Sequence, residues 1–403
     1  MSRINVLWVI DHVCYDGNLH GGGRLYWNVV PRFDPDRFKV VPCFLRSSDE
    51  VREVFKGSPA PVTIFDKGKY DLTTLFTFLR IIKRENIHLM HLHCYASSVF
   101  GRAAGMITGV PTIIHDYDTN IYFPYVWYLR ITDRVFAGKT SGAVAASPKV
   151  RDFLINRRKI EANKIRMMFH AVPTEESVPI SAERIAKTRE KLGINNHAKI
   201  VGTFTKLGPE RGNRYLIRTA AEVLKSALDT HFVIVHKPTY YHRVPDAYKG
   251  LTKIYDPAAM EEELLDLVSE LGIEKRIHLI ESLDDPDELM SICDVVVAPF
   301  LDDRFSSVYL LKAMTRGTPL IATDFGEQRE IIKNGVNGYL VSPGDVKELA
   351  ETILKVLADP EKLQQMSIQA RTMSEQYSVD AYVETLQEWY TALANNRSNR
   401  YSS

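Results

Sequence analysis

Residues 300–338 read FLDDRFSSVYLLKAMTRGTPLIATDFGEQREIIKNGVNG. The pattern predicts a strand over 295–300, a polar loop, an amphipathic helix between Ser306 and Gly317, and a second strand over 319–323. A helix that starts directly after a strand leaves unpaired N–H groups at the carboxyl edge of a sheet, where α/β proteins hold phosphates. The stretch therefore predicts an α/β fold with an anion-binding edge.

Strands and helices alternate on both sides of this stretch. Short apolar runs predict strands over 5–11, 39–45, 62–65, 89–93, 112–115, 142–146, 200–204, 231–235 and 277–280, and amphipathic runs predict helices over 24–33, 72–85, 97–108, 213–228, 260–271 and 286–293. Such alternation favours a parallel sheet with helices on both faces. We therefore expect an α/β protein with two doubly wound, Rossmann-like domains that face each other across a cleft.

A chain of 403 residues is also too long for one ordinary core. We expect an N-terminal domain over 1–178, a polar linker over 179–196 that ends in a short helix over 181–192, and a C-terminal domain over 197–376. A last helix and a polar tail occupy 377–403.

Composition excludes several classes of protein. The apolar and charged fractions, 45% and 25%, are those of an ordinary globular protein. The first apolar run is too short for a signal peptide, and no run approaches the roughly 20 apolar residues that span a bilayer. The four cysteines lie far apart without metal-ligand spacing, and three of them sit in apolar runs: Cys14, Cys43, Cys94 and Cys293. Buried thiols favour a reducing cytoplasm.

Charge is distributed unevenly along the chain. Residues 1–180 hold 24 Lys and Arg against 17 Asp and Glu, a net of +7, whereas the remainder holds 27 against 33, a net of −6. A basic first domain suits an anionic substrate or a peripheral membrane contact, although ordinary scatter is an equal alternative. The aromatic segment 121–136, with Arg130 and Arg134, fits a membrane interface, a lipid-linked acceptor or simply core. The basic triplet 157–159 is interpreted as a solvated helix end, so nucleic-acid binding is not expected.

Two positions in the first domain suggest ligand contacts. Gly21 to Gly23 follow the first strand, where glycine lets backbone approach a phosphate or sugar, or simply forms a flexible turn. The segment is not a GxGxxG fingerprint, so a nicotinamide cofactor is not expected. His115 ends a strand, where an imidazole facing a cleft can bond a sugar hydroxyl, although a lone histidine is more often structural.

The loop 205–212, TKLGPERG, follows the first strand of the second domain. Lys206 and Arg211 stand five residues apart on this Gly/Pro loop, ahead of a helix. Two such cations can clamp a diphosphate from two sides, and the alternative is a solvated loop with ordinary surface charges.

Residues 285–340 resemble the donor-binding region of retaining glycosyltransferases of the GT-B fold, family 4. The resemblance implies that the loop carrying Gly22 and Gly23 reaches the donor phosphates and the acceptor, that His115 is the active-site histidine, and that Lys206 and Arg211 contact the donor diphosphate. It also implies a last helix that crosses back to the first domain. No metal and no cofactor are expected, because the cations would stabilise the leaving diphosphate.

The family's two glutamates, eight positions apart, are absent. Alignment on the Lys-Ala-Met tripeptide that begins at Lys312 places Arg304 and Lys312 where those carboxylates would stand. What remains is the helix start, whose N–H groups could hold a phosphate. The predicted catalytic residues are His115, Lys206 and Arg211, and the predicted donor-binding residues are Gly22, Gly23, Thr205, Arg304, Ser306, Ser307, Val308 and Lys312.

Four functional hypotheses stay open. The leading one is a cytoplasmic transferase that moves a sugar from a nucleotide diphosphate donor to an unknown acceptor, with retention. The alternative is a relative that kept the fold as a binding or regulatory protein and lost the chemistry. A sugar-nucleotide epimerase or hydrolase is a third, and a transferase that uses an acidic donor sugar is a fourth.

Overall fold

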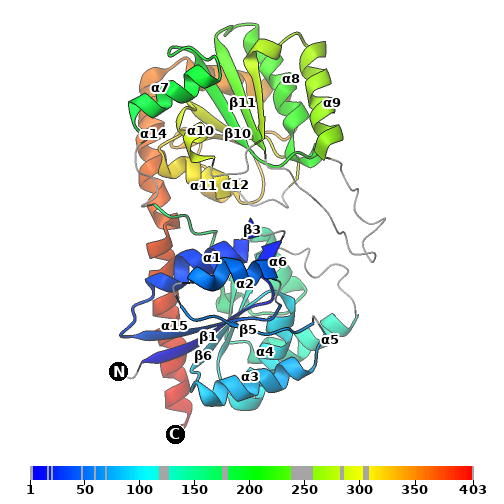
Figure 1. Cartoon of the computed structure of the whole chain (residues 1–403), viewed down its shortest axis with the longest axis vertical. Coiled ribbons are helices and arrows are strands. Elements are labelled where there is room, and N and C mark those ends of the chain that lie inside the picture. Colours follow the sequence, from blue (N-terminus) through cyan, green and yellow to red (C-terminus); the bar gives the residue numbers. More distant parts are fainter. Residues whose placement is uncertain are drawn as a thin grey trace. The chain divides into compact units, whose positions relative to one another are not determined.

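A computed structural model of the chain describes residues 3–15, 18–19, 21–46, 49–58, 60–68, 70–117, 127–174, 180–236, 257–281, 286–302 and 308–401. The chain forms two compact units (Figure 1). Unit 1 comprises Met1–Pro173 together with Gln376–Ser403, and unit 2 comprises Thr174–Glu375.

Unit 1 is built on a seven-stranded sheet in the order β5-β4-β1-β6-β7-β8-β9, with every neighbouring pair parallel. Its strands are β1 (Ile4–Ile10), β4 (Phe38–Phe44), β5 (Thr63–Ile64), β6 (Leu89–His93), β7 (Thr112–Asp116), β8 (Gly142–Ala145) and β9 (Ile165–Met167). A small antiparallel hairpin, β2 (Cys14–Tyr15) and β3 (Asn18–Leu19), follows β1.

Helices cover both faces of this sheet (Figure 1). Its helices are α1 (Gly21–Val29), α2 (Asp49–Val54), α3 (Thr73–Arg84), α4 (Tyr95–Thr108), α5 (Trp127–Phe136), α6 (Pro148–Asn156) and α15 (Val379–Tyr401), with short 3-10 turns at Val30–Arg32, Phe55–Gly57, Ala137–Lys139, Ala162–Lys164 and Glu375–Tyr377. In α3 the buried residues Thr74, Phe78, Ile81 and Ile82 recur at helical spacing and form its inner face.

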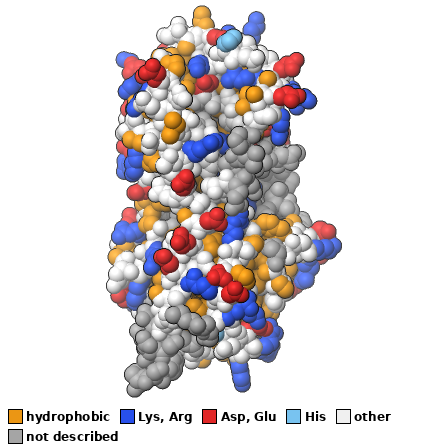
Figure 2. All heavy atoms as spheres, turned by 90° about the vertical axis from the view of Figure 1, so that its left-hand side faces the viewer, with side chains coloured by type: hydrophobic (Ala, Val, Ile, Leu, Met, Phe, Trp, Pro, Cys, Tyr) orange, Lys and Arg blue, Asp and Glu red, His pale blue; other side chains and the backbone are white. Residues whose placement is uncertain are grey.

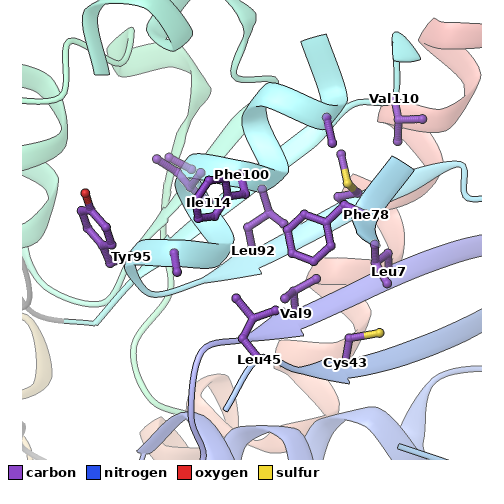
Figure 3. Close-up of a cluster of buried hydrophobic side chains, with 14 of the residues drawn as sticks. Leu7, Val9, Cys43, Leu45, Phe78, Leu92, Tyr95, Phe100, Val110 and Ile114 are labelled. Carbon is purple, nitrogen blue, oxygen red and sulfur yellow. The ribbon is translucent and has the colours of Figure 1, made fainter. Parts of the chain in front are cut away.

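Alternate residues of each strand enter two different cores. Leu7 and Val9 of β1 pack with Phe78 and Leu92 under the layer of α3, α4, α5 and α6 (Figure 3). Trp8, between them, packs on the other face with α1, α2 and α15. This period of two explains why β1 reads as one continuous apolar run, since both of its faces are buried.

Helix α15 belongs to unit 1 although it ends the chain. Its residues Leu386 and Tyr390 are fully buried against the sheet. The Arg166 guanidinium lies 4.7 Å from the Trp389 ring centroid, and the Gln387 carboxamide accepts a hydrogen bond from the Asp34 N–H. The last helix therefore supplies one wall of the core of unit 1.

Unit 2 is built on a six-stranded parallel sheet in the order β12-β11-β10-β13-β14-β15. Its strands are β10 (Lys199–Phe204), β11 (Thr230–His236), β12 (Ile277–Glu281), β13 (Val295–Ala298), β14 (Leu320–Thr323) and β15 (Gly338–Val341). Its helices are α7 (Ala182–Lys191), α8 (Asn213–Leu224), α9 (Pro257–Glu270), α10 (Asp287–Ser291), α11 (Val308–Thr315), α12 (Gln328–Ile331), α13 (Val346–Leu357) and α14 (Pro360–Ser374), with 3-10 turns at Pro209–Arg211 and Glu274–Arg276. The two doubly wound sheets confirm the expected α/β fold.

Three details differ from the sequence expectations. The stretch 179–196, expected as a linker that ends in a short helix, does contain that helix as α7. The Thr188 hydroxyl and the Arg184 guanidinium of α7 both bond Glu288 of α10, however, so the stretch is part of unit 2. The glycines expected in a loop before α1 form its first turn. Arg158, expected on a solvated helix end, is fully buried.

Arg158 is buried because it completes a charge network inside unit 1. Its guanidinium donates to Asp116 at 2.7 Å and to Asp133 at 3.0 Å, and Arg102 donates to Asp133 at 2.5 Å. Burial would raise the pKa of Asp133, but the two guanidinium groups hold it below its ordinary value. The two buried cations, Arg102 and Arg158, are tolerated here since two buried carboxylates neutralise them.

None of the helices in the described ranges is both long enough and apolar enough to cross a membrane.

Candidate functional site

The strand order of unit 2 reverses between β10 and β13. From β10 the chain proceeds outward to β11 and β12, and from β13 it proceeds the opposite way to β14 and β15. In open α/β sheets, ligands bind outside the carboxyl ends of the strands at such a reversal. The loops that follow β10 and β13 are therefore the first place to look for a ligand site in unit 2.

These two loops pack tightly against each other. The Leu301 N–H donates to the Glu210 carbonyl at 2.9 Å. Gly212, with φ +74°, approaches so closely that a Cβ atom there would lie 1.7 Å from the Pro299 carbonyl oxygen. Only glycine satisfies both the left-handed backbone and this contact, which fixes the loop 205–212 beside the loop after β13.

Three predicted site residues lie on this edge. The Arg211 guanidinium lies 5.6 Å from the Phe300 ring centroid, and its Nη1 is 3.5 Å from the Thr205 hydroxyl oxygen. Lys206 is exposed, and its carbonyl accepts a hydrogen bond from Asn213 at 3.3 Å. The structure thus brings Thr205 and Arg211 together beside the loop after β13, with Lys206 on the same loop.

Helix α11 begins at Val308, after the loop that follows β13. The predicted residues Arg304, Ser306 and Ser307 lie outside the described residues. Lys312, on the second turn of α11, has its ammonium nitrogen 3.6 Å from an Asp287 carboxylate oxygen of α10, and Arg316 donates to the same carboxylate at 2.5 Å. An acid on a neighbouring helix therefore attracts the Lys312 charge.

Unit 1 has a corresponding reversal between β1 and β6. Here the Asp11 carboxylate accepts hydrogen bonds from the Ala96 and Ser97 N–H groups at 2.7 and 2.8 Å, at the start of α4. Burial raises the pKa of Asp11 above its ordinary value, and these bonds offset part of the rise. The protein's own carboxylate thus occupies the helix start in unit 1, a feature that the sequence analysis missed.

The predicted donor-loop glycines, Gly22 and Gly23, are buried in the first turn of α1. A helix start rich in glycine has low helix propensity, so the turn depends on the buried residues Leu25, Tyr26 and Val29 that follow it. The two glycines are therefore helical residues of unit 1 rather than parts of an open loop.

His115 is fully buried and belongs to a stack of aromatic rings. Its ring centroid lies 4.7 Å from that of His93, 5.3 Å from that of His91 and 4.3 Å from that of Tyr117. His93 Nδ1 is hydrogen-bonded to the Tyr117 hydroxyl at 2.8 Å, and His91 Nδ1 to the Tyr390 hydroxyl. The Nε2 atoms of His91 and His93 and the Nδ1 atom of His115 have no hydrogen-bond partner within the described part of the chain.

Burial keeps these imidazoles neutral. It lowers the pKa of His91 to about 3, and it lowers the pKa of His93 and of His115 well below 6.5, with a further contribution from neighbouring imidazoles. A neutral His115 offers no positive charge, and its unpartnered Nδ1 atom is buried, so a sugar hydroxyl could reach it only after neighbouring side chains move.

The three histidines also form a cluster that sequence reasoning missed, with potential ligand atoms within 4.8 Å of one another. Their rings stack at interplanar angles of 15° to 34°, so their lone pairs run side by side instead of converging on one point. In this conformation the cluster is a packed stack, and metal ligation would require rotation of the rings. The signal in the sequence was the His-x-His spacing in β6, whereas the register that pairs His93 with His115 is visible only in the sheet.

Both units match models of glycosyltransferase families. The model for Glycosyltransferase Family 4 matches residues 20–176, and the model for Glycosyl transferases group 1 matches residues 184–373. The chain is 21% identical over 302 residues to the Escherichia coli UDP-Gal:alpha-D-GlcNAc-diphosphoundecaprenol alpha-1,3-galactosyltransferase, covering 72% of this chain and 71% of that protein. It is 23% identical over 315 residues to alpha-D-kanosaminyltransferase from Streptomyces kanamyceticus, covering 74% and 76%.

Solved structures share the fold. The crystal structure of a glycosyltransferase from Rickettsia africae superposes with a TM-score of 0.80 at 17% identity, covering 98% of this chain and all of that one. Anabaena Alr3699/HepE in complex with UDP superposes with a TM-score of 0.74 at 20% identity, covering 97% of this chain and all of that one. Unit 1 is therefore similar to Glycosyltransferase Family 4, unit 2 is similar to Glycosyl transferases group 1, and the chain shares its fold with a solved glycosyltransferase.

Proposed function

We propose that the protein is a glycosyltransferase that moves a sugar from a nucleoside diphosphate donor to an acceptor, with retention at the anomeric carbon. The observation that carries the proposal is the edge of unit 2, where Arg211 and Thr205 meet the loop after β13 at the reversal of the strand order. Relatives support a uridine donor, since one is named for UDP-Gal and a structural neighbour was solved with UDP-glucose.

The chemistry follows from charge. As the sugar–oxygen bond breaks, negative charge grows on the leaving diphosphate, and positively charged groups fixed beside it stabilise that charge. Arg211 and Lys206 would supply the positive charge, and the amides at the start of α11 would add hydrogen bonds. Attack from the face that the diphosphate leaves would give retention. No metal is needed in this scheme, so we expect EDTA to leave turnover unchanged.

His115 would have a different role. Because burial lowers its pKa well below 6.5, it would accept or donate one hydrogen bond to a hydroxyl of the donor sugar and would not stabilise charge. Its Nδ1 atom is buried, so this contact requires neighbouring side chains to move when the donor binds. The acceptor stays open. The E. coli relative is named for a diphosphoundecaprenol-linked acceptor, which makes a lipid-linked glycan the first class to test.

The buried free thiols Cys43, Cys94 and Cys293 support a reducing compartment such as the cytoplasm.

Calorimetry with UDP tests the donor site. Arg211→Ala removes a charge-assisted contact, which is worth about 1.5–3 kcal/mol, so we expect UDP to bind roughly ten- to a hundredfold more weakly. The matched control is Arg371→Ala in α14, because Arg371 lines a pocket with Asp294 and Pro319, which precede β13 and β14 at the opposite edge of the same sheet. Equal affinity for UDP in the Arg211 and Arg371 variants would contradict the proposed donor site.

The second candidate function is a binding protein that has lost transfer. The closeness of Lys312 to Asp287 favours it, since the position aligned with a family glutamate is occupied by a cation turned toward a neighbouring helix. This candidate predicts UDP binding without release of UDP from UDP-sugars, whereas the transferase requires both.

A further inference from the structure

The exposed apolar side chains of unit 1 are gathered on three consecutive helices. Every large hydrophobic residue found exposed within the described part of unit 1 lies on α3, α4 or α5 or at the start of α3. Together they are Tyr70, Leu72, Phe76, Met106, Ile107, Trp127, Ile131 and Val135, with exposed fractions from 47% to 74%. In unit 2 the corresponding residues are scattered over α9, α14 and several loops.

The three helices form one continuous layer. Figure 1 shows α3, α4 and α5 on the same face of the sheet of unit 1. Helix α4 contacts both of the others: its Arg102 bonds Asp133 and lies 5.2 Å from the Phe136 ring centroid of α5. At the other side, the Tyr95 ring at the start of α4 lies 6.1 Å from that of Tyr70.

The outer side chains of α5 lie outside the hydrophobic core of unit 1. Leu129, Asp133 and Phe136 face inward and are buried. Trp127, at 71% exposed, and Ile131, at 54%, stand four residues apart on the opposite side, and Val135 continues the same stripe. The helix therefore has a buried inner side and an outer stripe of apolar side chains that are more than half exposed.

The charge of this layer has a single sign. Helices α3, α4 and α5 contain one acidic residue, Asp133, which is buried in the pair with Arg102 and Arg158. The exposed charged residues of the three helices are all basic: Arg80, Lys83, Arg84, Arg130 and Arg134. The acids that flank α3, Asp71 and Glu85, are each paired with a cation, Lys67 and Lys39. On the face of the molecule in Figure 2, by contrast, acidic and basic side chains are interspersed.

We propose that the layer of α3, α4 and α5 docks on the surface of an anionic lipid bilayer. An exposed tryptophan and aliphatic side chains suit the interfacial region, and cations beside them suit lipid phosphates. The sequence had suggested such a contact from the basic first domain and from segment 121–136, whereas the structure points to the outer sides of α3, α4 and α5. The proposal does not rest on the transferase chemistry.

Vesicle binding tests the proposal with the full chain. We expect co-sedimentation with vesicles of phosphatidylcholine and phosphatidylglycerol, and none with phosphatidylcholine alone. Removal of one cation near an anionic surface weakens binding about fivefold, so Arg130→Glu with Arg134→Glu should weaken it by about 25-fold or more. Trp127→Ser should weaken binding and reduce the blue shift of tryptophan fluorescence on vesicle addition.

The matched control is Arg52→Glu with Lys56→Glu. These exposed cations have the same spacing, but they lie on α2 and its 3-10 turn, which pack on the other face of the sheet. The control should bind vesicles as the unchanged protein does.

Two results would overturn the proposal. One is no binding to anionic vesicles at low salt, or an equal loss in the control variant. The other is a dimer in analytical ultracentrifugation that Ile131→Glu dissociates, without vesicle binding, since that outcome would assign the surface to a second copy of the chain.

Discussion

Acid should unfold unit 1 through the histidine stack. His91, His93 and His115 are at most 1% exposed, and burial holds the pKa of His91 near 3 and the other two pKa values well below 6.5. The unfolded chain binds protons at these residues below about pH 6.5, whereas the folded chain does not. Unit 1 therefore has its full stability above that pH, and its free energy of unfolding decreases as the pH falls, because protons bind the unfolded chain.

The magnitude follows from the same pKa values. At pH 5 an imidazole with an unfolded pKa of 6.5 favours the unfolded state by about 2 kcal/mol when the folded state cannot protonate. Three such groups together cost about 6 kcal/mol, which is comparable to the roughly 5–15 kcal/mol that stabilises an ordinary domain. Unit 1 should consequently lose about 6 kcal/mol of stability between pH 7 and pH 5.

The assay can isolate unit 1. All four tryptophans, Trp8, Trp27, Trp127 and Trp389, belong to this unit, so urea unfolding of the full chain followed by tryptophan fluorescence reports on it. His91→Asn keeps a hydrogen-bonding group near Tyr390 but cannot take up a proton in this range. The variant should reduce the pH slope of the unfolding free energy by about 1.4 kcal/mol per pH unit below pH 6.

The control is His197→Asn, which changes an exposed histidine of unit 2 and should leave the transition of unit 1 unchanged. A free energy of unfolding that stays constant from pH 7 to pH 5 would refute the reasoning. An unchanged slope in His91→Asn would refute it as well.

Two further predictions concern the packing of each unit. Gly212→Ala places a methyl group 1.7 Å from the Pro299 carbonyl oxygen and should separate the two loops, so UDP should bind at least tenfold more weakly in calorimetry. The control variant Gly57→Ala, at a position where nothing lies within 4 Å, should bind UDP normally. Equal UDP affinity of the two variants would contradict the assignment of these loops to the donor site. Arg158→Met leaves the Asp116 carboxylate buried without its cation and should destabilise unit 1 by about 3–5 kcal/mol in urea unfolding at pH 7.5. A loss of stability below about 1 kcal/mol would mean that the buried network is no stronger than a surface ion pair.

The fold could be predicted from sequence because a strand that is buried on both faces of a sheet appears in the sequence as a short continuous apolar run. The run expected as a strand over 5–11 matches β1 within one residue, since each position enters one of two cores. The loop 205–212 was predicted for a similar reason, because a Gly/Pro segment between a buried strand and an amphipathic helix is a strong local signal for a turn at the sheet edge.

The features that sequence reasoning missed depend on distant partners. Arg158 is buried because of Asp116 and Asp133, which lie 42 and 25 residues away, and no local pattern separates it from its solvated neighbours. The histidine stack depends on the register between β6 and β7 and on Tyr390 of the last helix, 299 residues after His91. The first turn of α1 is a case in which tertiary packing outweighs the low helix propensity of glycine.

The two units share a topology, yet the carboxyl edges of their sheets differ in how well they can bind an anion, because one carboxylate occupies the edge of unit 1. In unit 1 the Asp11 side chain takes up the N–H groups of Ala96 and Ser97, so a second anion at that helix start would meet a like charge and have no donors there. In unit 2 the equivalent edge presents the Arg211 cation beside the Thr205 hydroxyl. A diphosphate should therefore bind unit 2. The corresponding edge of unit 1 is better suited to neutral hydroxyl groups, because the N–H groups at its helix start already hold a carboxylate.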